Sequence, residues 1–98
     1  YGKSYRPVAQ AVAQHLPAKE KCLAERELTD TQRASLAYFV GIEPLAADST
    51  AGQACRWLLV QGDTRQELAP PPGRWTRVWE GSRPGDRREK FRLYRREN

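Results

Sequence analysis

Apolar residues near the start of the chain recur at the spacing of a helix. One face of a 3.6-residue repeat carries Tyr5, Val8, Ala9, Val12 and Leu16. Ser4 precedes this stripe as an N-cap residue, and Pro7 is tolerated within a first helical turn. Pro17 cannot continue the helix. The pattern therefore predicts a first helix that ends before Pro17.

A second helix, Asp30–Val40, is indicated by signals at both of its ends. Thr29 and Gln32 match the capping box, in which the side chain of each bonds the backbone N–H of the other. Gly41 stands where a residue in the left-handed conformation commonly ends a helix. We expect Leu36, Phe39 and Val40 to supply the buried face of this helix.

Extended segments are expected between and after the helices. They are Lys21–Arg26, Ile42–Leu45, Cys55–Gln61, Trp75–Glu80 and Lys90–Arg95. Cys55–Gln61 is the most hydrophobic and predicts a central strand, whereas Pro44 suggests an edge strand. In the last segment Phe91 and Leu93 alternate with Lys90, Arg92 and Tyr94, so two opposite faces are expected there.

The remaining segments predict turns and connections. Ala46–Gln53 is expected to be a surface loop, and Gly62-Asp63 to turn the chain. Pro70–Gly73 predicts a stiff connector, and Ser82–Asp86 contains typical turn residues. Together these elements predict an α/β fold: one small domain over residues 1–98, with two helices packed on a mixed four- to five-stranded sheet that ends in a β-hairpin.

Charge is distributed unevenly along the chain. Residues 74–98 hold nine Lys or Arg and four Asp or Glu, whereas residues 1–73 hold eight of each, so the formal +5 belongs to the C-terminal segment. Two Trp, a Phe and a Tyr are interleaved with these basic residues. Three interpretations fit such a segment. It could be a solvated strand face, it could bind a nucleic acid whose bases stack on Trp75, Trp79 or Tyr94, or it could lie against an anionic membrane surface. The pattern alone leaves these alternatives open.

Known catalytic patterns are missing from the sequence. His15 has no triad partner nearby, and a surface position in a last helical turn is its expected role. Glycine-rich phosphate loops and metal-ligand spacings do not occur, and the carboxylate pairs Glu25/Glu27 and Asp86/Glu89 predict solvated or Arg-paired charge. We therefore expect no catalytic residue, no cofactor and no metal site in this chain.

Two cysteines each open a predicted strand, Cys22 before Leu23 and Cys55 before Trp57–Val60. If the strands are adjacent and parallel, both thiols lie at the same end of the sheet. A disulfide and a pair of buried free thiols are equally compatible with this spacing, and the compartment decides between them.

Four segments resemble a known family. They are Lys3–Pro17, which opens with KSYRP, Cys22–Ile42, Cys55–Gly62 with CRWLLVQ, and Trp79–Glu97 with RPGDR and LYRR. This combination resembles the C-terminal soluble region of bacterial multi-spanning membrane glycosyltransferases. That family is related to the dolichyl-phosphate-mannose protein mannosyltransferases and to the lipid A aminoarabinose transferases.

The resemblance implies a non-catalytic accessory domain at the periplasmic face of the bacterial inner membrane. Its parent enzyme would use a polyprenyl-phosphate-linked sugar, and the catalytic carboxylate would belong to the membrane part. The periplasmic location favours a disulfide between Cys22 and Cys55. A chain that begins at Tyr1 and contains no Met fits this expectation of a fragment from a larger protein.

The resemblance also implies partners. The first is the parent's own transmembrane domain, and the others are anionic lipid headgroups or the lipid-linked sugar. The residues expected to face the membrane or an anion are Arg83, Arg87, Arg88 and Lys90. A basic Arg/aromatic nucleic-acid-binding module is the alternative, and nucleic acid is the less expected partner because no second basic face is available to extend a groove.

Overall fold

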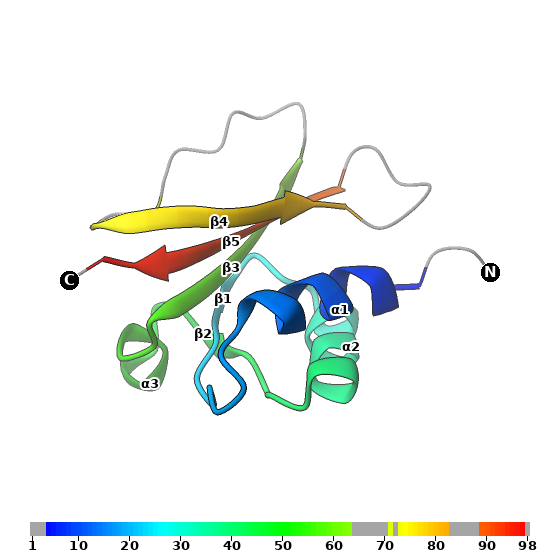
Figure 1. Cartoon of the computed structure of the whole chain (residues 1–98), viewed down its shortest axis with the longest axis horizontal. Helices are drawn as coiled ribbons and strands as arrows, with labels where there is room; N and C mark the ends of the chain where they lie inside the picture. The colour runs from blue at the N-terminus through cyan, green and yellow to red at the C-terminus, as the bar shows by residue number, and fades with distance from the viewer. Residues whose placement is uncertain (1–3, 64–70, 72, 83–88, 98) are drawn as a thin grey trace.

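A mixed sheet with two helices on one face forms the framework of the domain, here described from a computed structural model (Figure 1). The structure describes residues 4–63, 71, 73–82 and 89–97. Its helices are α1 (Arg6–His15), α2 (Asp30–Val40) and α3 (Thr50–Gln53). Its strands are β1 (Ala24–Arg26), β2 (Leu45–Ala46), β3 (Trp57–Asp63), β4 (Trp75–Gly81) and β5 (Glu89–Arg96).

The strand order across the sheet is β2-β1-β3-β5-β4. Strand β1 pairs in parallel with both β2 and β3, whereas β5 is antiparallel to β3 and to β4. Helices α1 and α2 lie together beneath the sheet in Figure 1, and the short α3 lies at the end of the sheet near β2. The predicted α/β fold with two main helices, a mixed sheet and a C-terminal hairpin is confirmed.

Helix α1 begins later than the Ser4 cap predicts. The residue at its N-cap is Tyr5, whose side chain makes no capping hydrogen bond. Ser4 still contributes, because its hydroxyl accepts a hydrogen bond from the backbone N–H of Arg6 at 3.0 Å. Val8, Ala9 and Val12 are buried as their spacing predicts, and Leu16 follows the helix in an extended conformation. The amphipathic pattern is thus correct, and the cap is wrong by one residue.

Helix α2 has the boundaries that its sequence predicts. The Thr29 hydroxyl accepts from the Gln32 N–H at 3.1 Å, and the Gln32 side-chain oxygen accepts from the Thr29 N–H at 2.8 Å. Gly41 ends the helix with φ of +84° and donates its N–H to the Ala37 carbonyl. Both ends therefore follow from local hydrogen bonds. The predicted buried face is correct for Leu36, but Phe39 is 36% exposed, because the buried side of α2 is formed by Gln32 and Leu36.

Two predicted connections are partly wrong. Gly62 and Asp63 do not turn the chain but extend β3, because they pair with Lys90 and Glu89 of β5. The expected loop Ala46–Gln53 contains the one-turn helix α3, which Ser49 caps by accepting from the Gly52 N–H. In both places tertiary pairing or a local cap outweighs the turn signal.

The core lies on both faces of the sheet. Toward α1 and α2 it contains Val8, Ala9, Val12, Leu16, Leu23, Leu28, Leu36, Trp57, Leu59, Phe91 and Leu93. A smaller cluster on the other face contains Ala24, Cys55, Leu58, Val60 and Tyr94. The central strand β3 contributes to both, as its continuous apolar run predicts.

A disulfide joins Cys22 to Cys55, with 5.2 Å between their Cα atoms. Cys22 precedes β1 and Cys55 precedes β3, and these strands are parallel neighbours. The sulfur atoms therefore meet at the amino ends of the two strands, which confirms the predicted pairing. None of the helices in the described part of the chain has the length and apolar character to cross a membrane.

Candidate functional site

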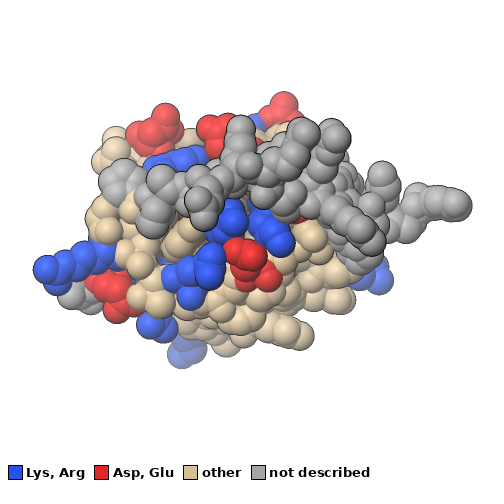
Figure 2. Space-filling view, turned by 90° about the horizontal axis from the view of Figure 1, so that it is seen from above, with Lys and Arg blue, Asp and Glu red and all other residues tan. Residues whose placement is uncertain are grey.

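The sheet face opposite α1 and α2 carries a group of basic side chains from β4 and β5. The register pairs Glu80 of β4 with Arg92 of β5, and Arg77 with Tyr94. Lys90 lies two residues before Arg92 and therefore on the same face. Figure 2 looks onto this side of the molecule and shows basic side chains gathered around acidic ones.

Glu80 is the common partner in this group. Its carboxylate lies 2.9 Å from Nε of Arg92, 3.1 Å from Nη1 of Arg77 and 3.6 Å from Nζ of Lys90. Desolvation raises the pKa of Glu80, but the hydrogen bond from Arg92 and the three positive charges outweigh it, so the pKa is lowered. One carboxylate against three cations leaves a net charge of +2 in the group, which favours an anionic ligand.

Arg92 is the least exposed of the three cations, with 14% of its side chain accessible. Its Nη1 atom is buried and has no hydrogen-bond partner among the described residues. A buried N–H donor without a partner is costly, whereas an anion oxygen would satisfy it with a charge-assisted hydrogen bond. Because this atom is buried, an anion from solvent does not reach it in this conformation.

A hollow of roughly 360 Å³ lies further along the same face. Ala24, Leu58 and Trp75 line it together with Arg26 and Arg96. The guanidinium of Arg96 lies 4.8 Å from the centroid of a Trp75 ring and donates to the Gln53 carbonyl at 2.9 Å. Asp48 also lines the hollow, which thus combines apolar side chains with two guanidinium groups and one carboxylate.

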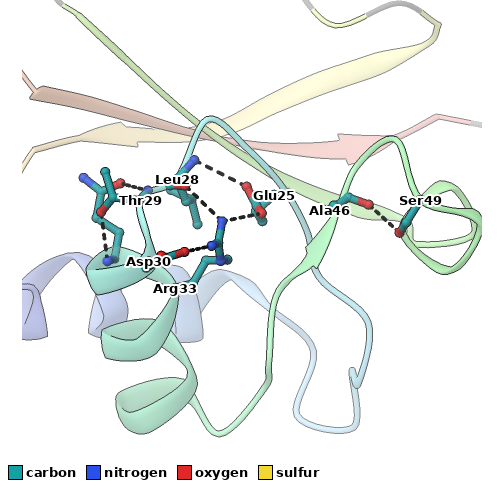
Figure 3. A network of polar contacts seen from close by, with 8 residues as sticks. Glu25, Leu28, Thr29, Asp30, Arg33, Ala46 and Ser49 are labelled. Atoms are coloured by element: carbon teal, nitrogen blue, oxygen red, sulfur yellow. Dashed lines mark hydrogen bonds and ion pairs between the residues drawn. The ribbon is translucent and has the colours of Figure 1, made fainter.

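A second hollow, of roughly 310 Å³, lies at the carboxyl ends of β1 and β2. Here Glu25 is 6% exposed, and Arg33 of α2 contacts its Oε2 atom at 3.2 Å (Figure 3). The Leu28 N–H donates to the Glu25 Oε1 atom at 3.3 Å, and Arg33 also pairs with Asp30. Hydrogen bonds thus satisfy Glu25 within the fold, so we assign it a structural role.

The loop beside this hollow contains an unusual backbone conformation. Glu27 has φ of +68°, in the left-handed region that costs a non-glycine residue about 1–2 kcal/mol. This turn lets the chain leave β1 and reach the Thr29 cap of α2, because Leu28 then donates back to Glu25. The strain is explained by this connection.

A third polar cluster joins the start of the described chain to the first residue of β5, at the tip end of the hairpin. The Tyr5 hydroxyl donates to Glu89 Oε2 at 3.0 Å, and the Gln32 amide donates to the same oxygen at 2.8 Å. Gln32 also lies 3.2 Å from the Tyr5 hydroxyl. Residues 84 positions apart are therefore in contact, and α1, α2 and β5 meet at one point.

The predicted site residues have different outcomes. Arg83, Arg87 and Arg88 lie outside the described residues, so their predicted role stays a prediction. Lys90 lies beside Glu80 on the sheet face opposite α1 and α2, as the alternation along the last strand predicts. His15 is exposed, and its Nδ1 atom lies 2.8 Å from the Ala11 carbonyl, which fits the expected surface position.

The carboxylate pairs differ from simple surface charge. Glu25 is Arg-paired as expected but buried, because Arg33 and the Leu28 N–H both contact its carboxylate. Asp86 lies outside the described residues, whereas Glu89 bonds to Tyr5 and Gln32. No group of three or more His, Cys, Asp or Glu able to hold a metal occurs among the residues that the structure describes.

Sequence reasoning missed the arrangement around Glu80 and the hollow between Arg26 and Arg96. A regular alternation along β4 would have been the only signal, and β4 does not provide one. Its register against β5 shifts between Arg77 and Trp79, so period-two counting fails across that point. As a result, Arg77 and Glu80 lie on one face although they are three residues apart.

The aromatic residues of the C-terminal segment are engaged within the fold. Trp79 is half-buried against the helix-side core, Tyr94 is 7% exposed, and Arg96 covers one ring of Trp75. Base stacking needs an accessible ring face. These positions therefore offer less to single-stranded nucleic acid than the sequence suggests.

A scan against protein-family models, a search of curated proteins and a search of solved structures each found no match to this chain.

Proposed function

We propose that this chain is a non-catalytic, extramembrane accessory domain of an integral-membrane glycosyltransferase that uses a polyprenyl-phosphate-linked sugar. It would lie at the periplasmic face of the bacterial inner membrane and support the active site or the binding of the acceptor. The proposal takes its enzyme class from the resemblance of Lys3–Pro17, Cys22–Ile42, Cys55–Gly62 and Trp79–Glu97 to that family.

The observation that carries the proposal is the contact between Tyr5 and Glu89 at 3.0 Å. It brings the start of α1 next to the first residue of β5, at the end of the hairpin where β4 connects to β5. A membrane domain that precedes Tyr1 in a longer protein would therefore lie on the same side as this tip end of the hairpin, where Lys90 follows Glu89. Basic residues near anionic headgroups contribute about 1 kcal/mol each to membrane association.

Two further features support the same proposal. The Cys22–Cys55 disulfide is compatible with an oxidising, extracytoplasmic compartment. The sheet face opposite α1 and α2 carries the group around Glu80, with its net charge of +2, and a hollow lined by Arg26 and Arg96. Such cations attract anionic groups, and the phosphate of a lipid-linked sugar or of an acceptor is one.

The membrane side of the proposal is tested by vesicle binding. The domain should bind vesicles that contain phosphatidylglycerol and bind phosphatidylcholine vesicles much more weakly. Replacing Arg83, Arg87, Arg88 and Lys90 by Gln should reduce the binding by more than about tenfold, given about 1 kcal/mol per basic residue. The attraction should fade as salt shortens the Debye length below about 8 Å.

A matched control removes four basic residues elsewhere. Lys19, Lys21, Arg56 and Arg95 are exposed, and Arg56 and Arg95 lie at the opposite end of β3 and β5 from Glu89, about 20 Å away. The quadruple Gln variant at these positions should bind like the wild type. Equal losses in both variants would mean that only net charge matters, which contradicts a membrane-facing hairpin.

The enzyme class is tested separately by the reading frame upstream of Tyr1. About a dozen apolar segments of about 20 residues are expected there. Micromolar affinity for single-stranded nucleic acid at physiological salt, together with no vesicle binding, would instead favour the nucleic-acid module.

A further inference from the structure

Tyr38 and Phe39 are the large hydrophobic residues that the described part of the chain leaves exposed, at 82% and 36%. They are neighbours in the last turn of α2, and their rings form an edge-to-face pair with centroids 5.0 Å apart. Single exposed apolar residues are common on protein surfaces, but a paired aromatic projection of this kind is not needed for folding.

The position of Tyr38 on α2 shows that it does not serve the core. Leu36 is the buried apolar residue of this helix, at 2% exposure. Tyr38 follows it by two residues, or about 200° of rotation, and so projects from the opposite side of the helix. The Tyr38 ring is therefore not part of the buried core that Leu36 joins.

Arg6 extends this feature from the neighbouring helix. Its guanidinium lies 5.3 Å from the centroid of the Phe39 ring. Arg6 is the first residue of α1, where a positive charge is unfavourable for the helix dipole, and it forms no ion pair with a carboxylate of the described residues. We call Arg6, Tyr38 and Phe39 the aromatic patch.

We propose that the aromatic patch inserts into the headgroup region of an anionic bilayer; this inference rests on the proposed membrane-apposed function. Tyrosine favours this region because its ring is apolar and its hydroxyl is polar, and a guanidinium bonds lipid phosphate. The uncompensated charge of Arg6 selects an anionic surface.

The size of the patch favours lipid over a protein partner. A whole aromatic side chain buries about 150–250 Å², whereas a stable protein interface needs about 800 Å² from each partner. Two partly exposed rings fall well short of that area. Shallow insertion requires no such area, because each ring contributes on its own.

The location of the patch agrees with the membrane side proposed above. Arg6 follows Tyr5, which contacts Glu89 at the tip end of the hairpin. The aromatic patch and this end of the hairpin therefore both flank the start of α1. The hairpin with its basic residues lies on one side of the start of α1, and the aromatic rings lie on the other. Both can therefore contact the same bilayer.

The test compares three variants in vesicle co-sedimentation at physiological salt. The double variant Tyr38→Ser with Phe39→Ser should bind phosphatidylglycerol vesicles at least about tenfold more weakly than the wild type. Tyr38→Trp should retain binding, and its added fluorescence should be quenched by phospholipid spin-labelled near the headgroup. Arg6→Gln should weaken binding to anionic vesicles, while Arg56→Gln, which removes a distant exposed charge, should not.

Stability is checked first by thermal unfolding, and Tyr38→Ser alone replaces the double variant if Phe39→Ser destabilises the fold. Wild-type binding by the Ser variants, or no quenching of the introduced indole in Tyr38→Trp, would overturn the inference. A concentration-dependent dimer that the Ser variants abolish would also overturn it, because a second copy would then cover the patch. If hairpin substitutions abolish binding and patch substitutions do not, the proposed function stands and this inference fails.

Discussion

Glu25 is a buried carboxylate whose charge is balanced from two directions. Arg33 contacts one oxygen at 3.2 Å, and the Leu28 N–H donates to the other at 3.3 Å. Arg33 also donates to the Leu28 carbonyl at 3.1 Å, so one guanidinium supports both the carboxylate and the loop that leads into α2. Removing either partner would leave a buried polar group unsatisfied.

We expect Arg33→Met to lower the free energy of unfolding by about 1–2 kcal/mol. Breaking a fully buried pair costs about 3–5 kcal/mol, and the smaller value follows because the Arg33 side chain is 38% exposed. Glu25→Gln in the Arg33→Met background should recover part of the loss, since it removes the uncompensated charge. Urea unfolding measures the stability of Arg33→Met, Glu25→Gln and the double variant, with Arg56→Met as the control. Additive effects of the two changes would argue against direct coupling.

Glu80 gives the domain a pH-dependent contribution to stability. Its pKa in the folded protein is lowered from 4.5, so the unfolded state binds the proton more readily. The stabilisation is therefore complete above about pH 4.5 and is lost as the pH falls through the lowered pKa.

We expect Glu80→Gln to be less stable than the wild type at pH 7, by less than about 1 kcal/mol at low salt. The difference should shrink below pH 4 and also at high salt, because screening weakens the exposed contacts with Arg77. Thermal unfolding between pH 3 and pH 7 tests this, with Glu43→Gln as an exposed control. A difference that stays constant across this pH range would contradict the assignment.

At the scale of elements, the two long helices are specified in different ways. Helix α2 has the reciprocal Thr29–Gln32 cap and the Gly41 terminus. Helix α1 lacks a side-chain cap and depends on its buried face of Val8, Ala9 and Val12. The ends of α2 are thus a local property, whereas α1 needs the sheet to hold it in place.

We expect Gly41→Ala to destabilise the domain by about 1 kcal/mol. A Cβ at Gly41 would meet no atom within 4 Å, so the cost comes from the backbone at φ of +84° and not from a clash. Gly41→Asn should cost less, because asparagine tolerates the left-handed region better. Chemical denaturation measures both variants, and equal losses for Ala and Asn would point to a steric cause instead.

For the whole molecule, the disulfide is the main covalent constraint. It links Cys22 and Cys55 across a separation of 33 residues and ties β1 to β3 at the start of both strands. In the chain-entropy account, closing such a loop destabilises the unfolded state by about 3–4 kcal/mol.

We expect reduction with dithiothreitol to lower the free energy of unfolding by about 3–4 kcal/mol. A Cys22→Ala, Cys55→Ala variant should show a similar stability with and without the reductant. Thiol titration of the unfolded, unreduced protein should find no free sulfhydryl. Two titratable thiols in protein prepared under oxidising conditions would refute the bond.

Local features of the sequence determined much of this architecture. Helix α2 follows from Thr29, Gln32 and Gly41, because caps and left-handed ends depend on neighbours within four residues. The two faces of β5 follow from the alternation of Phe91 and Leu93 with polar residues. Helix α3 was not predicted because its single turn is too short to show a helical repeat of apolar residues in the sequence.

Only the tertiary structure decided which residues meet. The β4 register that sets Glu80 opposite Arg92 depends on an irregularity between Arg77 and Trp79. The contact between Tyr5 and Glu89 spans 84 residues, and no local pattern encodes it. Glu25 looks like surface charge in the sequence, and it is buried because the connection into α2 folds back so that Leu28 and Arg33 contact its carboxylate. Hydrogen-bonding partners distant in sequence become neighbours only when the sheet assembles, so the sequence pattern identifies the elements and the assembled fold decides which charged side chains lie together.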